Sequence, residues 1–183
     1  MKHHLWRFSA SIALALCFGG QALAQTFTAG NVAGETTVGI LYSEAVVLGS
    51  AETVANYAVA GVTVTAARLA GPEDVVVILT VSGSPAAGAQ VNVAGVATAG
   101  GGTVNGSVSL DQTTEITAVL GTDGTDPIED GNCIYLGNGG YFLEAGGSDI
   151  WNADDHGEFI YQAFSGAFDA VVRIESITGP QAW

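Results

Sequence analysis

Cysteine is nearly absent from the 183-residue chain, which has only Cys17 and Cys133. Cys17 lies in an N-terminal segment that we expect to be removed, so no disulfide can form within the remaining chain. Cys133 is then left for burial as a small apolar side chain or for pairing with another chain. One cysteine and three histidines, of which His3 and His4 are in the same segment, cannot supply a structural zinc site.

Basic residues are also scarce, because 4 lysines and arginines face 18 aspartates and glutamates. Lys2 and Arg7 lie in the N-terminal segment, which leaves Arg68 and Arg173 and a net charge near −16. This balance excludes nucleic acid as a partner, since phosphate contacts require a basic surface. It also argues against attraction to anionic membranes. The acidic side chains favour solubility outside the cell, and some of them are candidates for calcium binding.

No hydrophobic run is long enough to span a bilayer, which takes roughly 20 residues. The longest N-terminal run, Ile12–Phe18, follows Lys2 and Arg7 and precedes the small-residue pattern Ala22-Leu23-Ala24. These three parts define a secretory signal peptide, with cleavage expected between Ala24 and Gln25. A lipoprotein signal is excluded because Leu16 precedes Cys17. The sequence therefore predicts export, to the extracellular space or the cell surface.

Short strand patterns fill the region after the signal, with 26 glycines and few prolines between them. Val38, Ile40 and Tyr42 alternate with Gly39 and Leu41. Val75–Val81 is continuously apolar except for Thr80, which predicts a strand buried on both faces. A short helical turn is expected at residues 51–56, with Ser50 as its N-cap. The sequence predicts an all-β fold of the sandwich type.

The composition changes at residues 121–127, Gly-Thr-Asp-Gly-Thr-Asp-Pro, which predict a linker. Aromatic residues become frequent after it. We therefore expect a signal peptide at 1–24, a first sandwich at 25–120, the linker at 121–127 and a second module at 128–183.

Two resemblances sharpen this division. Residues Val38–Val96 resemble the bacterial Ig-like domains of S-layer and other cell-surface proteins, on Tyr42-Ser43-Glu44, Asn56-Tyr57, Thr80–Gly83 and Val91–Val96. The resemblance, taken over about 30–110, implies an Ig-like β-sandwich that acts as a spacer or scaffold. Ala45 and Thr98 depart from the family's usual residues.

Residues 126–183 resemble the N-terminal part of a concanavalin A-like lectin or glucanase module, on Gly146–Trp151, Phe159–Gln162 and Ala170–Ile174. The resemblance implies a partial concanavalin A-like β-sandwich, with carbohydrate as the ligand class. It also implies that the chain ends inside that module. Asp169–Ile177 alternates in polarity and predicts an interior strand whose neighbour is missing.

The candidate site residues are acidic. Asp149, Asp154 and Asp155 are the predicted calcium ligands, without a complete calcium-loop spacing. Catalysis by carboxylates is not expected, because adjacent Asp154 and Asp155 would point to opposite faces of a strand, and glycosidases need a matched pair. The sequence has no Gly-x-Ser-x-Gly nucleophile motif that could pair with His156. No glycine-rich stretch ends in the Gly-Lys-Ser of a phosphate-binding loop.

Three functions remain open from the sequence. The first is a non-enzymatic module of an exported bacterial protein, a spacer or scaffold with carbohydrate as its candidate partner. The second is the non-catalytic front of a larger secreted hydrolase that acts on polysaccharides. The third is a structural adhesin or S-layer component.

Overall fold

The computed structural model describes residues 26–114, 116–120, 132–144, 150–151, 154–155, 157–161 and 165–177. Strands dominate these residues, and the helical pieces are one turn of α-helix and one of 3-10 helix. The all-β prediction is confirmed. Within the described part of the chain, none of the helices has the length and apolar character needed to cross a bilayer.

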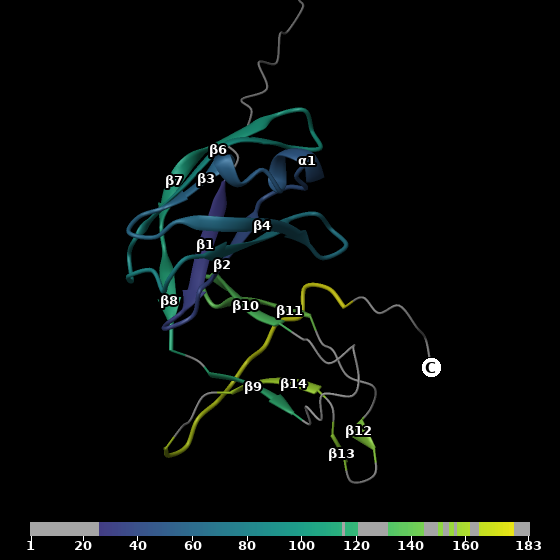
Figure 1. The fold of residues 1–183 in the computed structure, drawn as a ribbon. Helices are drawn as coiled ribbons and strands as arrows, with labels where there is room; N and C mark the ends of the chain where they lie inside the picture. The colour runs from purple at the N-terminus through teal and green to yellow at the C-terminus, as the bar shows by residue number, and fades with distance from the viewer. Residues whose placement is uncertain are drawn as a thin grey trace, which may run out of the picture.

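A five-stranded sheet forms the centre of the molecule (Figure 1). Its strand order is β4-β5-β2-β1-β8, and all neighbours are antiparallel except β1 and β8, which run parallel. The strands are β1 (Phe27–Val32), β2 (Thr37–Tyr42), β4 (Val64–Ala70), β5 (Val76–Val81) and β8 (Asp111–Thr113).

A three-stranded antiparallel sheet covers one face of this sheet, in the order β3 (Tyr57–Val59), β6 (Gln90–Ala97) and β7 (Thr103–Ser109). Alternate residues of both sheets point inward, as the period of a strand requires. They form one apolar core, whose most buried members are Val38, Ile40, Val77, Leu79, Val91, Val93, Val96 and Val104. Two facing sheets of this kind make a sandwich. Membership of the Ig-like family stays a prediction.

The other face of the five-stranded sheet is covered by a hairpin from much later in the chain, β10 (Asn132–Gly137) and β11 (Gly140–Glu144). Ile134 and Leu136 of β10 pack with Val76 and Ile78 of β5 in a second apolar cluster. The predicted burial of β5 on both faces is confirmed, since Val76, Val77, Ile78 and Leu79 are all buried.

Glycines allow the hairpin to approach closely. Gly30 of β1 and Gly39 of β2 are register partners on the outer face of the sheet. A Cβ on Gly39 would lie 2.6 Å from the carbonyl oxygen of Tyr135, and a Cβ on Gly30 would clash with the backbone nitrogen of Gly137. Glycine within a strand often marks such a close backbone approach.

The remaining strands form two small pairs below the hairpin (Figure 1). β9 (Ile116–Leu120) pairs antiparallel with β14 (Gly157–Tyr161), and β12 (Ile150–Trp151) pairs with β13 (Asp154–Asp155). β9 ends the predicted first module, yet its partner strand belongs to the predicted second one. The predicted linker at 121–127 lies outside the described residues. The domain division and the concanavalin A-like assignment of 128–183 stay predictions.

Two local predictions are wrong. Ser50 is not an N-cap, because α1 (Leu48–Ala51) begins after Val47 and the 3-10 turn η1 (Val54–Asn56) follows separately. The Ser50 hydroxyl donates instead to the Val47 carbonyl and accepts from the Ala97 amide. The predicted interior strand Asp169–Ile177 is not formed, since residues 167–177 belong to no strand and are exposed.

Candidate functional site

A groove of about 230 Å³ lies where the sandwich meets the turn of the β10–β11 hairpin. One side is β1 and the end of β7, and the other side is the start of β8 with the hairpin turn. The lining residues are Phe27, Thr28, Ala29, Val108, Ser109, Asp111, Gly137 and Asn138.

Asp111 holds the hairpin turn at this groove. Its Oδ2 accepts a hydrogen bond of 2.6 Å from the Tyr135 hydroxyl and one of 2.8 Å from the Asn138 backbone amide. The Tyr135 hydroxyl in turn accepts from the Gly139 amide. The hydrogen bond from the Tyr135 hydroxyl is the main reason that the pKa of Asp111 lies below its ordinary value, and the hydrogen bond from the Asn138 backbone is the next. The carboxylate is therefore ionised and oriented at neutral pH.

The turn itself needs left-handed backbone at three successive residues. Gly137, Asn138 and Gly139 have φ angles of 85°, 53° and 75°. Glycine adopts this region without strain, and asparagine tolerates it better than other residues. The turn therefore directs the Asn138 amide at the exposed Asp111 carboxylate and the Gly139 amide at the Tyr135 hydroxyl.

A buried asparagine and its half-buried glutamine partner stabilise the same end of the sandwich. Asn31 is 1% exposed, and its amide group donates to the carbonyls of Glu35 and Thr37. Its Oδ1 accepts a 2.8 Å hydrogen bond from Gln112, which also donates to the Pro85 carbonyl. The buried polar group is thereby satisfied, as burial in an apolar core requires.

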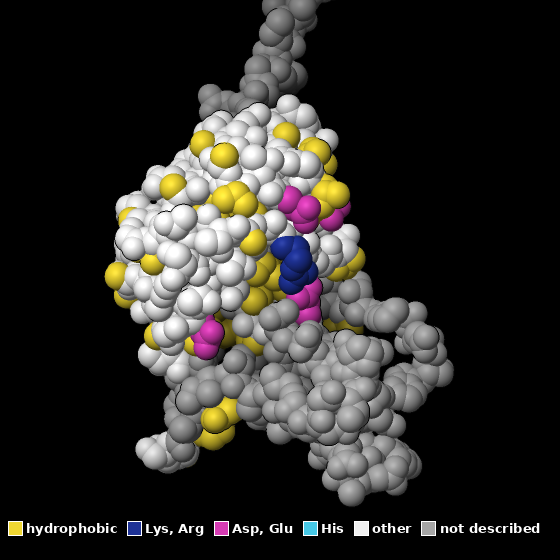
Figure 2. Space-filling view, in the orientation of Figure 1, with side chains coloured by type: hydrophobic (Ala, Val, Ile, Leu, Met, Phe, Trp, Pro, Cys, Tyr) yellow, Lys and Arg dark blue, Asp and Glu magenta, His cyan; other side chains and the backbone are white. Residues whose placement is uncertain are grey.

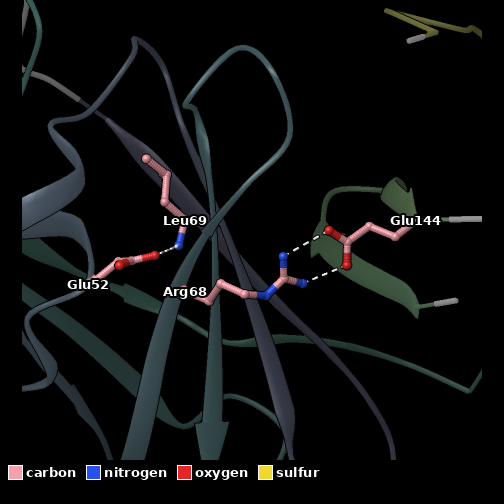
Figure 3. Close-up of polar contacts among 4 residues, drawn as sticks. All are labelled: Glu52, Arg68, Leu69 and Glu144. Carbon is pink, nitrogen blue, oxygen red and sulfur yellow. Dashed lines mark hydrogen bonds and ion pairs between the residues drawn. The ribbon is translucent and has the colours of Figure 1, made fainter. Parts of the chain in front are cut away.

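Arg68 connects the sandwich to the hairpin at the opposite edge (Figure 3). Its two terminal nitrogens bond the two carboxylate oxygens of Glu144 at 2.8 and 2.6 Å. The side chains are 48% and 31% exposed, so solvent screens the pair in part. The hydrogen bond to Glu144 raises the pKa of Arg68 above its ordinary value. Figure 2 shows one dark-blue group of Lys or Arg atoms on this face, with magenta Asp or Glu atoms above and below it.

Glu52 approaches the same strand from the other side, where its carboxylate accepts a hydrogen bond from the Leu69 amide (Figure 3). β4 is an edge strand of the five-stranded sheet, so its outward amides have no neighbouring strand to bond. Glu52 satisfies one of them. Together Glu52 and Glu144 connect the segment after α1, β4 and the hairpin.

A pair of tyrosines lies in the sandwich core beside α1. The Tyr42 hydroxyl donates to the Tyr57 hydroxyl at 3.4 Å, and the Tyr57 hydroxyl donates to the Ala51 carbonyl at 2.6 Å. Burial raises the pKa of both phenols, with the neighbouring hydroxyl adding to the rise for Tyr42. Both hydroxyls therefore stay protonated donors in the folded chain.

The predicted calcium ligands are placed only in part. Asp154 and Asp155 form β13, opposite Trp151 and Ile150 of β12, while Asp149 lies outside the described residues. The side chains of Asp154 and Asp155 are likewise outside the described set. The described residues contain no group of three or more His, Cys, Asp or Glu side chains placed so that they could hold a metal ion. Calcium binding by Asp149, Asp154 and Asp155 stays a prediction.

Sequence reasoning missed the residues that join the hairpin to the sandwich. Gly137-Asn138-Gly139-Gly140 contains the Asn-Gly pair typical of tight hairpin turns. Gly30 and Gly39, both inside apolar strand patterns, were a second signal. The partners Asp111, Arg68 and Glu144 carry no local signal, because each bonds a residue far away in the chain.

Comparison with known proteins gives two structural likenesses. No protein-family model matches the chain, and no curated protein matches it. A crystal structure of the S-layer protein rSbsC, spanning its residues 31–844, is similar to 70% of this chain with a TM-score of 0.42 and 11% identity. A crystal structure of the N-terminal part of the bacterial S-layer protein SbsC is similar over 73%, with a TM-score of 0.44 and 12% identity. The likeness spans 21% and 37% of those chains, respectively.

Proposed function

We propose that this chain is a non-enzymatic structural module of an exported bacterial protein, a spacer or scaffold at the cell surface. The observation that carries the proposal is that polar side chains of the sandwich bond the hairpin and hold it on the central sheet. Asp111, Arg68 and Thr28 each connect the sandwich to the distant hairpin, at sequence separations of 24, 76 and 108 residues from Tyr135, Glu144 and Leu136. Contacts of this kind fix one part of the fold on another, which suits a structural module.

The packing is consistent with a rigid spacer. The central sheet has an apolar cluster on each of its faces, and its most buried strand, β5, contributes to both. Covering both faces of a sheet removes most of its apolar surface from water and resists bending. The N-terminal pattern around Ala24 supplies the route of export.

Export and processing are tested by expressing the whole chain in a bacterial host and fractionating the cells. We expect exported material whose first residue is Gln25. An intact Met1 in the exported fraction, or retention of all material in the cytoplasm, contradicts the proposal.

Absence of catalysis is tested by incubating the processed chain with a panel of polysaccharides and measuring released reducing ends. We expect no release above the buffer control. Turnover that disappears in Asp154→Ala or Glu158→Ala, with folding unchanged, would support a polysaccharide-acting hydrolase and contradict a purely structural role.

Carbohydrate binding is a second candidate, favoured by the groove at the hairpin turn. Its rim carries the Ser109 hydroxyl and the Asn138 amide beside the Asp111 carboxylate, a set of groups that suits sugar hydroxyls. Titration calorimetry with soluble oligosaccharides tests this. Binding by the processed chain that is lost in Asn138→Gly, which removes the side-chain amide but keeps the left-handed backbone, and kept in Asn105→Ala, on the exposed part of β7, would place the ligand in the groove.

A further inference from the structure

The last described segment, residues 165–177, leaves large apolar side chains in water. Val171, Val172, Ile174 and Ile177 are 96%, 84%, 66% and 81% exposed. The segment is neither helix nor strand (yellow in Figure 1). A contiguous exposed apolar patch of this kind on a soluble protein commonly marks an interaction surface.

The sequence of this segment suits a β-strand. Ala170-Val171-Val172-Arg173-Ile174 is rich in β-branched residues, which favour a pleated backbone. In a strand, the even-numbered residues Ala170, Val172 and Ile174 lie on one face, and the odd-numbered Asp169, Val171 and Arg173 on the other. One face is thus wholly apolar, and the other carries charges of both signs around a central valine.

Arg173 makes the choice of partner specific. Two arginines follow the signal peptide. Arg68 is paired with Glu144 of the hairpin, whereas Arg173 lies in the exposed segment. Its Nε and Nη2 bond the two carboxylate oxygens of Glu175 of its own segment, each at 2.9 Å, and the two side chains are largely exposed at 83% and 70%. Water screens this pair more fully than the less exposed Arg68–Glu144 pair, so it contributes little stability despite its two hydrogen bonds. Arg173 can therefore take a second carboxylate at small cost.

We propose that two copies of the chain associate by antiparallel pairing of this segment, centred on Val171. In that register Val171 lies opposite Val171 of the second copy, and Asp169 lies opposite Arg173 on each side. Ala170 lies opposite Val172 on the apolar face. The strand is complementary to itself in charge and in shape, because every directly opposed charge meets its opposite.

The strength of the association follows from the same features. Each cross-strand pair of opposite charge contributes a modest stabilisation, and like charges directly opposite are destabilising. A two-stranded ribbon alone is marginal in water, and two copies near −16 repel each other. The dimer is therefore reversible, dependent on concentration and favoured at moderate salt, which screens the long-range repulsion.

Charge reversal tests the register. Sedimentation velocity of the processed chain should show a sedimentation coefficient that rises with concentration. Asp169→Arg places arginine opposite arginine, and Arg173→Asp places aspartate opposite aspartate, so each variant alone should associate more weakly, on the order of tenfold. An equimolar mixture of the two variants restores both opposite-charge pairs and should recover the wild-type behaviour.

Cysteine crosslinking tests the centre of the pairing independently. In a Cys133→Ala background, Val171→Cys should form a disulfide-linked dimer under mild oxidation, because directly opposed side chains of an antiparallel pair need only a small adjustment to reach disulfide geometry. Ile174→Cys is the matched control, since it lies opposite Phe168 in this register and should crosslink poorly. Unchanged thermal melting of the sandwich shows that the variants fold.

Each contrary result overturns the proposal. A wild-type chain that stays monomeric at all concentrations leaves no association to explain. A dimer that both single charge variants form as well as wild type uses another surface, such as the β7 edge. Crosslinking of Ile174→Cys in place of Val171→Cys requires a different register.

Discussion

Gly30 of β1 and Gly39 of β2 lie opposite each other, and the backbone of β10 rests on both. Because neither residue has a side chain, the backbone of the hairpin can pack directly against the sheet. Thr28, two residues before Gly30 on the same face, donates a 2.7 Å hydrogen bond to the Leu136 carbonyl and anchors the strand there. The approach of the hairpin depends on these positions, and several measurements can test it.

A methyl group at Gly30 should displace the hairpin. Gly30→Ala should lower the free energy of unfolding by about 1–3 kcal/mol, the usual cost of overpacking. Gly83→Ala is the control, because its Cβ would meet nothing within 4 Å, and it should leave stability unchanged or slightly higher. Urea unfolding measures both. Equal stability of the two variants would contradict the close packing of the hairpin backbone on Gly30.

The contact of Asp111 with the hairpin turn should depend on pH. Its pKa is lowered in the folded chain, so the stabilisation is present above the unfolded value of about 3.9 and is lost as pH falls through the folded pKa. Asp111→Asn should lower the melting temperature at pH 7, and the difference from wild type should vanish at strongly acidic pH. Glu73→Gln, an exposed carboxylate between β4 and β5, controls for the charge alone. A difference that persists at low pH would contradict this role.

The bidentate pair Arg68–Glu144 should show measurable coupling. A double-mutant cycle with Arg68→Ala and Glu144→Ala should give about 0.5–1 kcal/mol, the upper range for exposed pairs, because both oxygens are engaged. High salt should reduce the coupling. A coupling energy of zero at low salt would mean that the pair does not help to hold the hairpin.

The buried tyrosines should make the sandwich sensitive to alkali. Since burial raises the pKa of Tyr42 and Tyr57, their stabilisation is present below the ordinary phenol pKa of about 10 and is lost as pH rises above it. Of the five tyrosines, these two should form phenolate only when the fold is lost, seen as a late step in absorbance near 295 nm. Tyr42→Phe with Tyr57→Phe should remove that step. Its survival in the double variant would assign it to other tyrosines.

The strands of the sandwich were predictable because their signal is local. Val38, Ile40 and Tyr42 recur at every second residue, which is the period of a strand. The continuous apolar run of β5 predicts burial on both faces. The covering partner of β5 was not predictable, since Ile134 and Leu136 are more than 50 residues away. Ser50 was misread because its hydroxyl bonds the Ala97 amide on β6, and no local pattern shows such a partner.

The candidate site was less accessible from the sequence than the fold. Acidic residues were sought as a cluster at Asp149, Asp154 and Asp155, whereas Asp111 acts through single contacts to a turn 27 residues later. Asp169–Ile177 has the composition of an interior strand, but a strand needs a neighbour to bond. Composition alone does not supply that neighbour, and the described segment is exposed.

Hydrogen–deuterium exchange of the processed chain tests most directly whether sandwich and hairpin form one structural unit. Peptides covering β1, β2 and β10 should be protected together and should lose protection in one cooperative step as denaturant is added. Gly30→Ala should lower the protection of β10 more than that of β5. Rapid exchange of β10 and β11 in the wild-type chain, while β1 and β2 stay protected, would contradict the account.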